Sequence, residues 1–424
     1  MSVERLPVPG RLRLRRAVGR DPHGRRQASP LELLFDLTFV VAFTQAGDQL
    51  SHYLALGQVG TAIGGFAFIL ISVCWAWVGY TWFASAFDTD DWLQRVLTMV
   101  QMVGVVILAL GVPAVFASIH SGHGIDFRLV AAGYVVMRVS MVAMWVRVAR
   151  HDPQNRRTAT LYIVFTAGAQ LGWVVLAAVR PQEPVVLVPL IVGLWIVELC
   201  GPVVATWDSG SKGGEWGGTP WNAAHIAERY GLLVIITLGE GILGTIAAVA
   251  AFVNRAGWSG EAVLITVAGV GLTLGLWWTY FIFPSGVVLA RHRNRKWAWS
   301  YGHIALFGAI AAVGAGLDVA AYAAEGRAAI DTTGVVLCVA VPVLIFCLLY
   351  FVLWSVLFRA VDPFHVGLAA GMVAVLVFAV VLATAGVPLG WCLLVVMASP
   401  AVVAVGYETG GYRHVEADIR REAS

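Results

Sequence analysis

Long runs of apolar residues alternate with short polar segments along almost the whole chain, and this pattern predicts membrane-spanning helices. A helix needs about 20 mainly apolar residues to cross the hydrocarbon core of a bilayer. The chain has twelve such segments, at 30–54, 60–87, 93–119, 127–149, 158–180, 185–207, 225–250, 260–284, 297–321, 331–357, 363–385 and 388–407. The last two come from one neutral run of 45 residues, which we divide at the turn-forming sequence Gly386-Val387-Pro388.

Composition supports a membrane protein. Hydrophobic residues make up 59% of the chain and charged residues only 12%, whereas a soluble domain carries roughly 25% charged residues. The five cysteines lie in apolar runs without a C-x-x-C spacing, so we expect neither disulfides nor a metal site. The first 29 residues carry eight arginines without an apolar core, which favours a cytoplasmic tail over a cleaved signal peptide.

The positions of the basic residues predict the orientation. Lys and Arg in short loops stay on the cytoplasmic side of a membrane. With the N-terminus inside, 23 of the 28 basic residues fall in cytoplasmic segments, four fall outside, and Arg138 lies within a predicted span. Adding or removing one helix would invert every later loop, so the pattern predicts an even number of spans and two cytoplasmic termini.

The two halves of the chain resemble each other. The second span carries Trp77 and Tyr80 in a W-x-x-Y pattern, and the eighth carries Trp277 and Tyr280 in the same pattern. An offset of six spans keeps the orientation, as in transporters built from parallel repeats. We therefore expect an all-α polytopic bundle with two six-helix repeats at 30–207 and 225–407. A basic tail (1–29), a cytoplasmic linker (208–224) and a second tail (408–424) complete the predicted organisation.

Two carboxylates open the first predicted span. Ser29, Pro30 and Glu32 have the spacing of a capping box, which gives Glu32 a structural role at the helix start. Asp36 lies one turn further along the same face. Two carboxylates near the entry of a membrane helix need a cation, a proton or water as partner, so a binding role for both stays open.

Further along the same span, Gln45, Asp48 and His52 fall within one sector of the helix. Gln45 is near the predicted mid-plane, where a glutamine is typical of a hydrogen bond between helices. Asp48 and His52 should lie toward the outer surface, either as an interfacial polar patch or as part of a site.

The seventh span contains the densest group of ionisable residues. His225, Glu228 and Arg229 stand at its start, and Glu240 follows 15 residues after His225 with a glycine on each side. A carboxylate at that depth is costly and indicates a functional site, such as one that binds a coupling proton. The alternative is a buried glutamate that pairs with a basic residue for packing.

Arg138 is the only cation deep within a predicted span. An unpaired charge there would be very costly, so we expect it to face a carboxylate. The candidates are Glu198, Glu240 and Asp36, and the sequence does not choose among them.

Aromatic residues are concentrated in the second and eighth spans. Some should form an interfacial belt. Others are candidates for the lining of a cavity: Trp75, Trp77, Tyr80, Trp277 and Tyr280.

Two motifs resemble those of a known family. Residues 31–40 (LELLFDLTFV) and 225–240 (HIAERYGLLVIITLGE) are similar to the two long motifs of the bacterial low temperature requirement A (LtrA) membrane proteins. The resemblance covers roughly 30–405 and extends to the aromatic run at 77–83. Tyr230 and Gly241 stand where the family motif usually has His and Ser. The resemblance implies a polytopic protein of the bacterial inner membrane, without a settled activity.

Buried carboxylates with His and Arg on the first helices of two repeats favour a transporter or channel-like protein for a small solute or ion, with or without coupling to protons. The alternatives are a membrane sensor or structural factor, suited to a family named for growth in the cold, and a membrane-embedded lipid enzyme. No catalytic residues, cofactor or metal are expected. The expected partners are the lipid bilayer and the solute, without nucleic acid, and the sequence does not give the oligomeric state.

Overall fold

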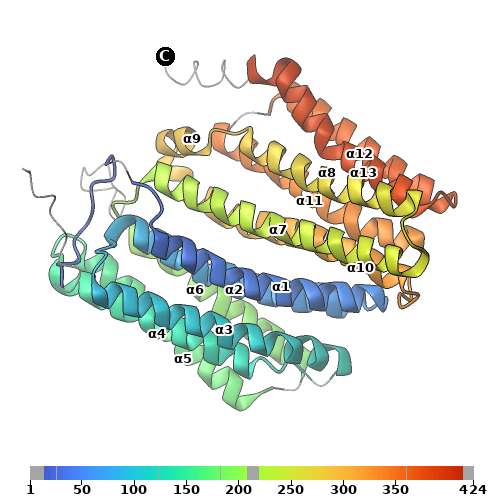
Figure 1. Cartoon of the computed structure of the whole chain (residues 1–424). Helices are drawn as coiled ribbons and strands as arrows, with labels where there is room; N and C mark the ends of the chain where they lie inside the picture. Colours follow the sequence, from blue (N-terminus) through green and yellow to red (C-terminus); the bar gives the residue numbers. More distant parts are fainter. Residues whose placement is uncertain are drawn as a thin grey trace, which may run out of the picture. The chain divides into compact units, whose positions relative to one another are not determined.

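The structure is a computed structural model that describes residues 14–24, 26–122, 124–181, 183–207, 219–359 and 361–413. Within these ranges the chain is helical and contains no strand (Figure 1). The long helices are α1 (Pro30–Ala55), α2 (Val59–Phe87), α3 (Trp92–Ser121), α4 (Arg128–His151), α5 (Arg156–Val179), α6 (Pro184–Trp207), α7 (Ala223–Ala256), α8 (Gly260–Phe281), α10 (Lys296–Ala324), α11 (Thr332–Phe358), α12 (Pro363–Thr384) and α13 (Leu389–Gly406).

These helices confirm the twelve predicted spans. In the described part of the chain, twelve helical segments are long and apolar enough to cross a membrane. The predicted turn between the last two also forms, because Gly386 adopts a φ of +82°, which a residue with a side chain rarely takes. A short helix that the sequence did not predict, α9 (Ser285–Arg291), follows Pro284 and extends the eighth span. The chain is thus an all-α multi-pass membrane protein.

The start of α1 has the predicted capping box. The main-chain N–H of Ser29 donates to Glu32 Oε2 at 2.8 Å, and the N–H of Glu32 donates to Ser29 Oγ at 3.3 Å. Arg26 also pairs with Glu32, at 3.1 Å. The side chains of Ser29 and Glu32 therefore each accept from the main-chain N–H of the other residue, which would otherwise lack a partner at the helix start.

The helices pack into two compact units. Unit 1 consists of Met1–Thr38, Ala76–Leu110 and Phe127–Asn222, and unit 2 of Phe39–Trp75, Gly111–Asp126 and Ala223–Ser424. In unit 1, α5 packs between α4 and α6. In unit 2, α7 packs on α8 and α10, α10 packs on α11, and α13 packs on α8 and α12. The most buried span is the one that contains α10, which forms the core of unit 2.

The predicted repeat at 30–207 and 225–407 stays a prediction. Most of the predicted linker and parts of both tails, at 1–13, 208–218 and 414–424, lie outside the described residues.

Candidate functional site

Unit 2 contains an open cavity of about 770 Å³. Its walls come from the last third of four helices: α1 around Asp48 and His52, α3 around Pro113, α7 from 247 to 254, and α10 around Asp318. Alanines form much of the wall, at Ala117, Ala247, Ala250, Ala251 and Ala321. Short side chains leave room between the helices, so the volume follows from the residue types at these positions.

Carboxylates occupy the deep side of this cavity. Asp48 and Asp318 line it, and Glu240 lies about two turns deeper along α7 than the nearest lining alanine. Each of the three carboxylates interacts electrostatically with the other two. Neither Asp48 nor Asp318 has an ion-pair or hydrogen-bond partner for its carboxylate among the described residues. We call these three residues the acidic triad.

Glu240 is only 8% exposed, and one hydrogen bond holds it. Thr44 Oγ1 donates to Glu240 Oε1 at 2.7 Å. Oε2 accepts no hydrogen bond from a described residue, and it lies 3.9 Å from the point where a Cβ would stand on Gly47, next to Asp48. The second oxygen of this buried carboxylate is therefore left for a proton, water or a ligand.

Glycines determine how closely the helices approach Glu240. A Cβ on Gly314 of α10 would lie 2.6 Å from the main-chain carbon of Glu240, and one on Gly241 would lie 2.6 Å from Thr273 Oγ1 of α8. A Cβ on Gly239 would meet nothing within 4 Å. Of the two glycines beside Glu240, only Gly241 lies where another helix approaches closely.

Sequence reasoning missed Asp318. The signal was present, because Asp318 is the only Asp, Glu, Lys or Arg in the predicted span 297–321. Gln45, which was predicted with Asp48 and His52, is half-buried and does not line the cavity.

Unit 1 contains a different arrangement of buried charge. Arg138 Nη2 lies 3.2 Å from Glu198 Oε2, and the two residues are 4% and 5% exposed. This pair confirms that Arg138 faces a carboxylate and selects Glu198 among the three candidates. Tyr134 donates to the same oxygen, and Gln170 Nε2 and Trp173 Nε1 donate to Oε1 at 3.1 and 2.9 Å.

Four donors therefore surround Glu198, and its charge is compensated inside the bundle. Such an arrangement is typical of a structural ion pair in a low-dielectric medium. Both carboxylate oxygens of Glu198 accept hydrogen bonds, whereas only Oε1 of Glu240 accepts one from a described residue.

The other candidates from α1 and α7 lie at helix starts. Asp36 is fully buried and accepts a 2.6 Å hydrogen bond from Trp77 Nε1. His225 and Arg229 are fully buried, and Glu228 is exposed. None of these residues lines the cavity beside the acidic triad.

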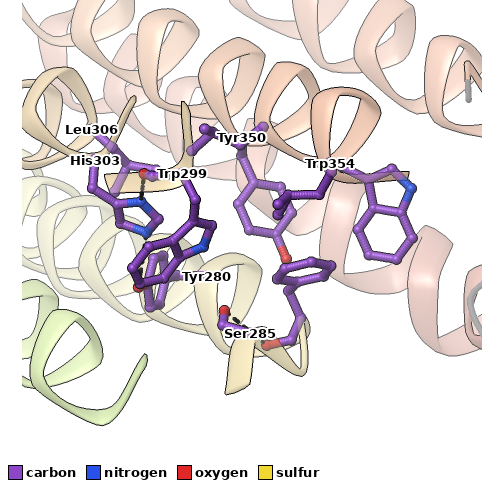
Figure 2. A pocket seen from close by; sticks show the side chains of 10 residues that line it. Tyr280, Ser285, Trp299, His303, Leu306, Tyr350 and Trp354 are labelled. Carbon is purple, nitrogen blue, oxygen red and sulfur yellow. Dashed lines mark hydrogen bonds between the residues drawn. The ribbon is translucent and has the colours of Figure 1, made fainter. Parts of the chain in front are cut away.

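The aromatic candidates have different surroundings. Trp75 packs edge-on against Tyr301, and Tyr80 OH lies 3.2 Å from Thr98 Oγ1. Trp277 is 44% exposed on the surface of the span. Tyr280 lines a second pocket of unit 2, which Figure 2 shows from close by.

This second pocket has a volume of about 20 Å³, enough for about one water molecule. His303 Nδ1 lies 2.7 Å from the carbonyl oxygen of Trp299, and Nε2 lies 3.1 Å from Tyr280 OH. The carbonyl can only accept, so Nδ1–H donates to it, and Nε2 accepts from Tyr280. Both ring nitrogens are engaged, and the pocket is too small for a solute.

The loop residue Asp91, next to α3, is fully buried, and its carboxylate accepts hydrogen bonds from several segments of unit 1. Arg147 Nη2 lies 2.5 Å from its Oδ2, and the N–H of Arg15 donates to the same oxygen at 3.0 Å. Burial raises the pKa of Asp91, but the hydrogen bonds from Arg147, Arg15 and Gln94 outweigh burial, so the pKa lies below its ordinary value.

The chemistry available at the acidic triad is the binding of cations or protons. In the described residues no group of three or more His, Cys, Asp or Glu side chains is arranged closely enough to hold a metal ion. Asp48 and Asp318 line the open cavity, and Thr44 donates a hydrogen bond to the deeper carboxylate of Glu240.

Comparison with known proteins gives two results. The chain is 31% identical over 219 residues to an uncharacterized protein, RA0937, of Rhizobium meliloti (strain 1021), across 51% of this chain and 50% of that protein. The chain thus spans about half the length of the curated relative that it matches. No solved structure matches the chain significantly.

A family model described as bacterial low temperature requirement A protein (LtrA) matches residues 27–400. The match includes the motif at the start of α1, the motif of α7 and all of the acidic triad. It extends over nearly all of the twelve spans, so the chain belongs to the bacterial low temperature requirement A (LtrA) family.

Proposed function

We propose that this protein is a proton-coupled transporter of a small solute in the bacterial inner membrane, with both termini in the cytoplasm. The observation that carries the proposal is the open cavity of about 770 Å³ with the acidic triad on its deep side. Binding pockets for small molecules have volumes of about 300–1,000 Å³. The orientation rests on the distribution of Lys and Arg in the loops.

The acidic triad supports coupling to protons. The three carboxylates repel one another electrostatically, so the group as a whole favours binding a proton or a cation. A solute that changes the charge or hydration of the cavity would therefore change how many protons the triad holds. Glu240 is the central residue in this scheme, since its Oε2 accepts no hydrogen bond from a described residue.

The leading alternative is a membrane sensor or structural factor. That function requires packed helices with compensated charges, such as the Arg138–Glu198 pair of unit 1. A sensor or structural function does not require an open cavity with unpaired carboxylates, so we favour transport. A membrane-embedded lipid enzyme has no supporting observation.

The test uses purified protein in liposomes that contain a pH-sensitive dye. Pools of amines, amino acids, sugars or inorganic ions are added outside, and proton movement is recorded. We expect at least one pool to drive proton movement with the wild type, and we expect Glu240→Gln to abolish it while the thermal unfolding curve stays close to that of the wild type. Glutamine keeps the size of the side chain and can accept from Thr44, but it cannot titrate.

Glu408→Gln is the matched control, because Glu408 is exposed and lies outside the cavity. It should transport like the wild type. Folded wild-type protein that responds to no pool would contradict the proposal, and so would Glu240→Gln with full activity.

A further inference from the structure

We infer that the cavity of unit 2 binds a small organic cation with an ammonium or guanidinium group. This inference rests on the proposed function, because it names the class of solute for the same site. It depends on three properties of the cavity: its charge, its aromatic wall and its size.

The charge of the cavity is negative where the ligand would bind. Asp48 and Asp318 line the cavity without ion-pair partners in the described residues, and Glu240 lies next to them with a free oxygen. The one arginine in the lining, Arg327, is near the opening and pairs with Glu325 at 2.8 Å. Its charge is thus compensated locally, and it forms no ion pair with the carboxylates on the deep side.

Aromatic side chains form part of the wall of the cavity. His52 packs edge-on against Tyr322, with ring centroids 6.3 Å apart, and both residues line the cavity together with Tyr53. One cation–π contact already exists within the chain, because Arg327 Cζ lies 4.9 Å from the centre of the Tyr322 ring. Organic cations bind to such faces through cation–π attraction, and this interaction adds to the attraction of the carboxylates.

The size of the cavity separates organic from inorganic cations. A volume of about 770 Å³ is far larger than a single dehydrated metal ion requires. The triad is also not arranged as a compact set of metal ligands. The charged group of an organic cation can contact the carboxylates while its carbon atoms contact the alanines of α7. An inorganic ion would leave the space beside these alanines unfilled.

The test measures binding to the purified full-length protein in detergent by calorimetry. The probes are tetraethylammonium and 1,4-diaminobutane, compared with sodium chloride, glutamate and glucose at equal concentration. We expect the two amines alone to bind. Asp48→Asn and Asp318→Asn should each weaken binding about tenfold, the equivalent of 1.4 kcal/mol, and Glu408→Gln should leave it unchanged.

A further variant provides an independent test if the aspartate variants fail to fold. Ala250 is exposed to the cavity, so Ala250→Trp should block amine binding by filling the space while it keeps all three carboxylates. Wild type that binds glutamate or glucose but neither amine overturns the inference, and so does unchanged amine binding in Asp48→Asn and Asp318→Asn.

The liposome assay separates this inference from the proposed function. Amine binding without proton movement would leave the inference in place and contradict transport. Proton movement driven only by anions or neutral solutes would support transport and contradict the inference.

Discussion

At the scale of single residues, the two buried carboxylates Glu198 and Glu240 have different surroundings. Glu198 accepts hydrogen bonds from four donors, one of which is the buried Arg138. Glu240 accepts one hydrogen bond, from Thr44, and faces two further carboxylates. A compensated pair stabilises the fold, whereas a carboxylate with a free oxygen in a cavity is available for binding. This difference leads to opposite expectations for the same chemical change.

Glu198→Gln should destabilise the protein, because it leaves Arg138 as a buried cation with neutral partners only. Breaking a buried pair costs roughly 3–5 kcal/mol, which thermal unfolding in detergent would detect. Glu325→Gln is the control, since its pair with Arg327 is largely exposed and should change stability by less than about 0.5 kcal/mol. Equal unfolding temperatures for wild type and Glu198→Gln would contradict a structural role for the pair.

Asp91 gives a prediction that depends on pH. Its pKa in the folded protein lies below its ordinary value of about 3.9, so its ionised form stabilises the fold. This stability is fully present above the unfolded pKa and is lost as the pH falls through the folded pKa. Asp91→Asn should therefore lower stability at pH 7 by roughly 3 kcal/mol, and the difference from wild type should shrink below about pH 4.

The adjacent Asp90 provides the control for this experiment, because its side chain is half-exposed in its pair with Arg95. Asp90→Asn should unfold like the wild type at both pH values. A constant difference between wild type and Asp91→Asn from pH 7 to pH 3 would contradict the assigned role of the ionised carboxylate.

At the scale of elements, the close approach of α7 and α10 holds Glu240 beside Asp318. A Cβ on Gly314 would overlap the main chain of Glu240, and one on Gly244 would lie 2.4 Å from the carbonyl oxygen of Gly314. Small residues allow such contacts between membrane helices, where packing rather than the hydrophobic effect drives association. The geometry of the triad therefore depends on two glycines that carry no chemistry themselves.

Gly314→Ala should separate α7 from α10 and lower the free energy of unfolding by about 1–3 kcal/mol, the usual cost of overpacking. The control is Gly239→Ala, next to Glu240 on α7, where a Cβ meets nothing within 4 Å. That change should be neutral or stabilise the helix by up to ~1 kcal/mol. If the two variants unfold at the same temperature, the glycine contact does not determine the packing.

The same elements explain what the sequence could and could not predict. The twelve spans follow from hydropathy, because a bilayer requires long apolar helices whatever their neighbours are. The capping box of Glu32 involves residues three apart and is equally local. The partner of Arg138 and the inclusion of Asp318 depend on which helices lie side by side. That information is absent from the pattern of any single span, although Glu198 and Asp318 each stand out as the lone charge of their own span.

At the scale of the whole molecule, the cavity and the predicted orientation combine into one expectation. The cavity is formed by the C-terminal parts of α1, α3, α7 and α10, which are the first, third, seventh and ninth spans. With a cytoplasmic N-terminus, every odd-numbered span ends on the outer side of the membrane. The cavity should therefore open to the exterior.

Cysteine labelling in intact cells tests this expectation, in a variant whose five native cysteines are replaced by alanine. Asn254→Cys places a thiol in the cavity at one end of α7, and Glu228→Cys places one at the exposed start of the same helix. A membrane-impermeant maleimide should label Asn254→Cys directly, because the cavity admits water from outside. It should label Glu228→Cys only after the cells are made permeable. Since 26 residues of helix separate the two positions, about 39 Å, they must lie at opposite faces of a bilayer whose hydrocarbon core is about 30 Å thick. The reverse labelling pattern would invert the topology and place the acidic triad within reach of the cytoplasm.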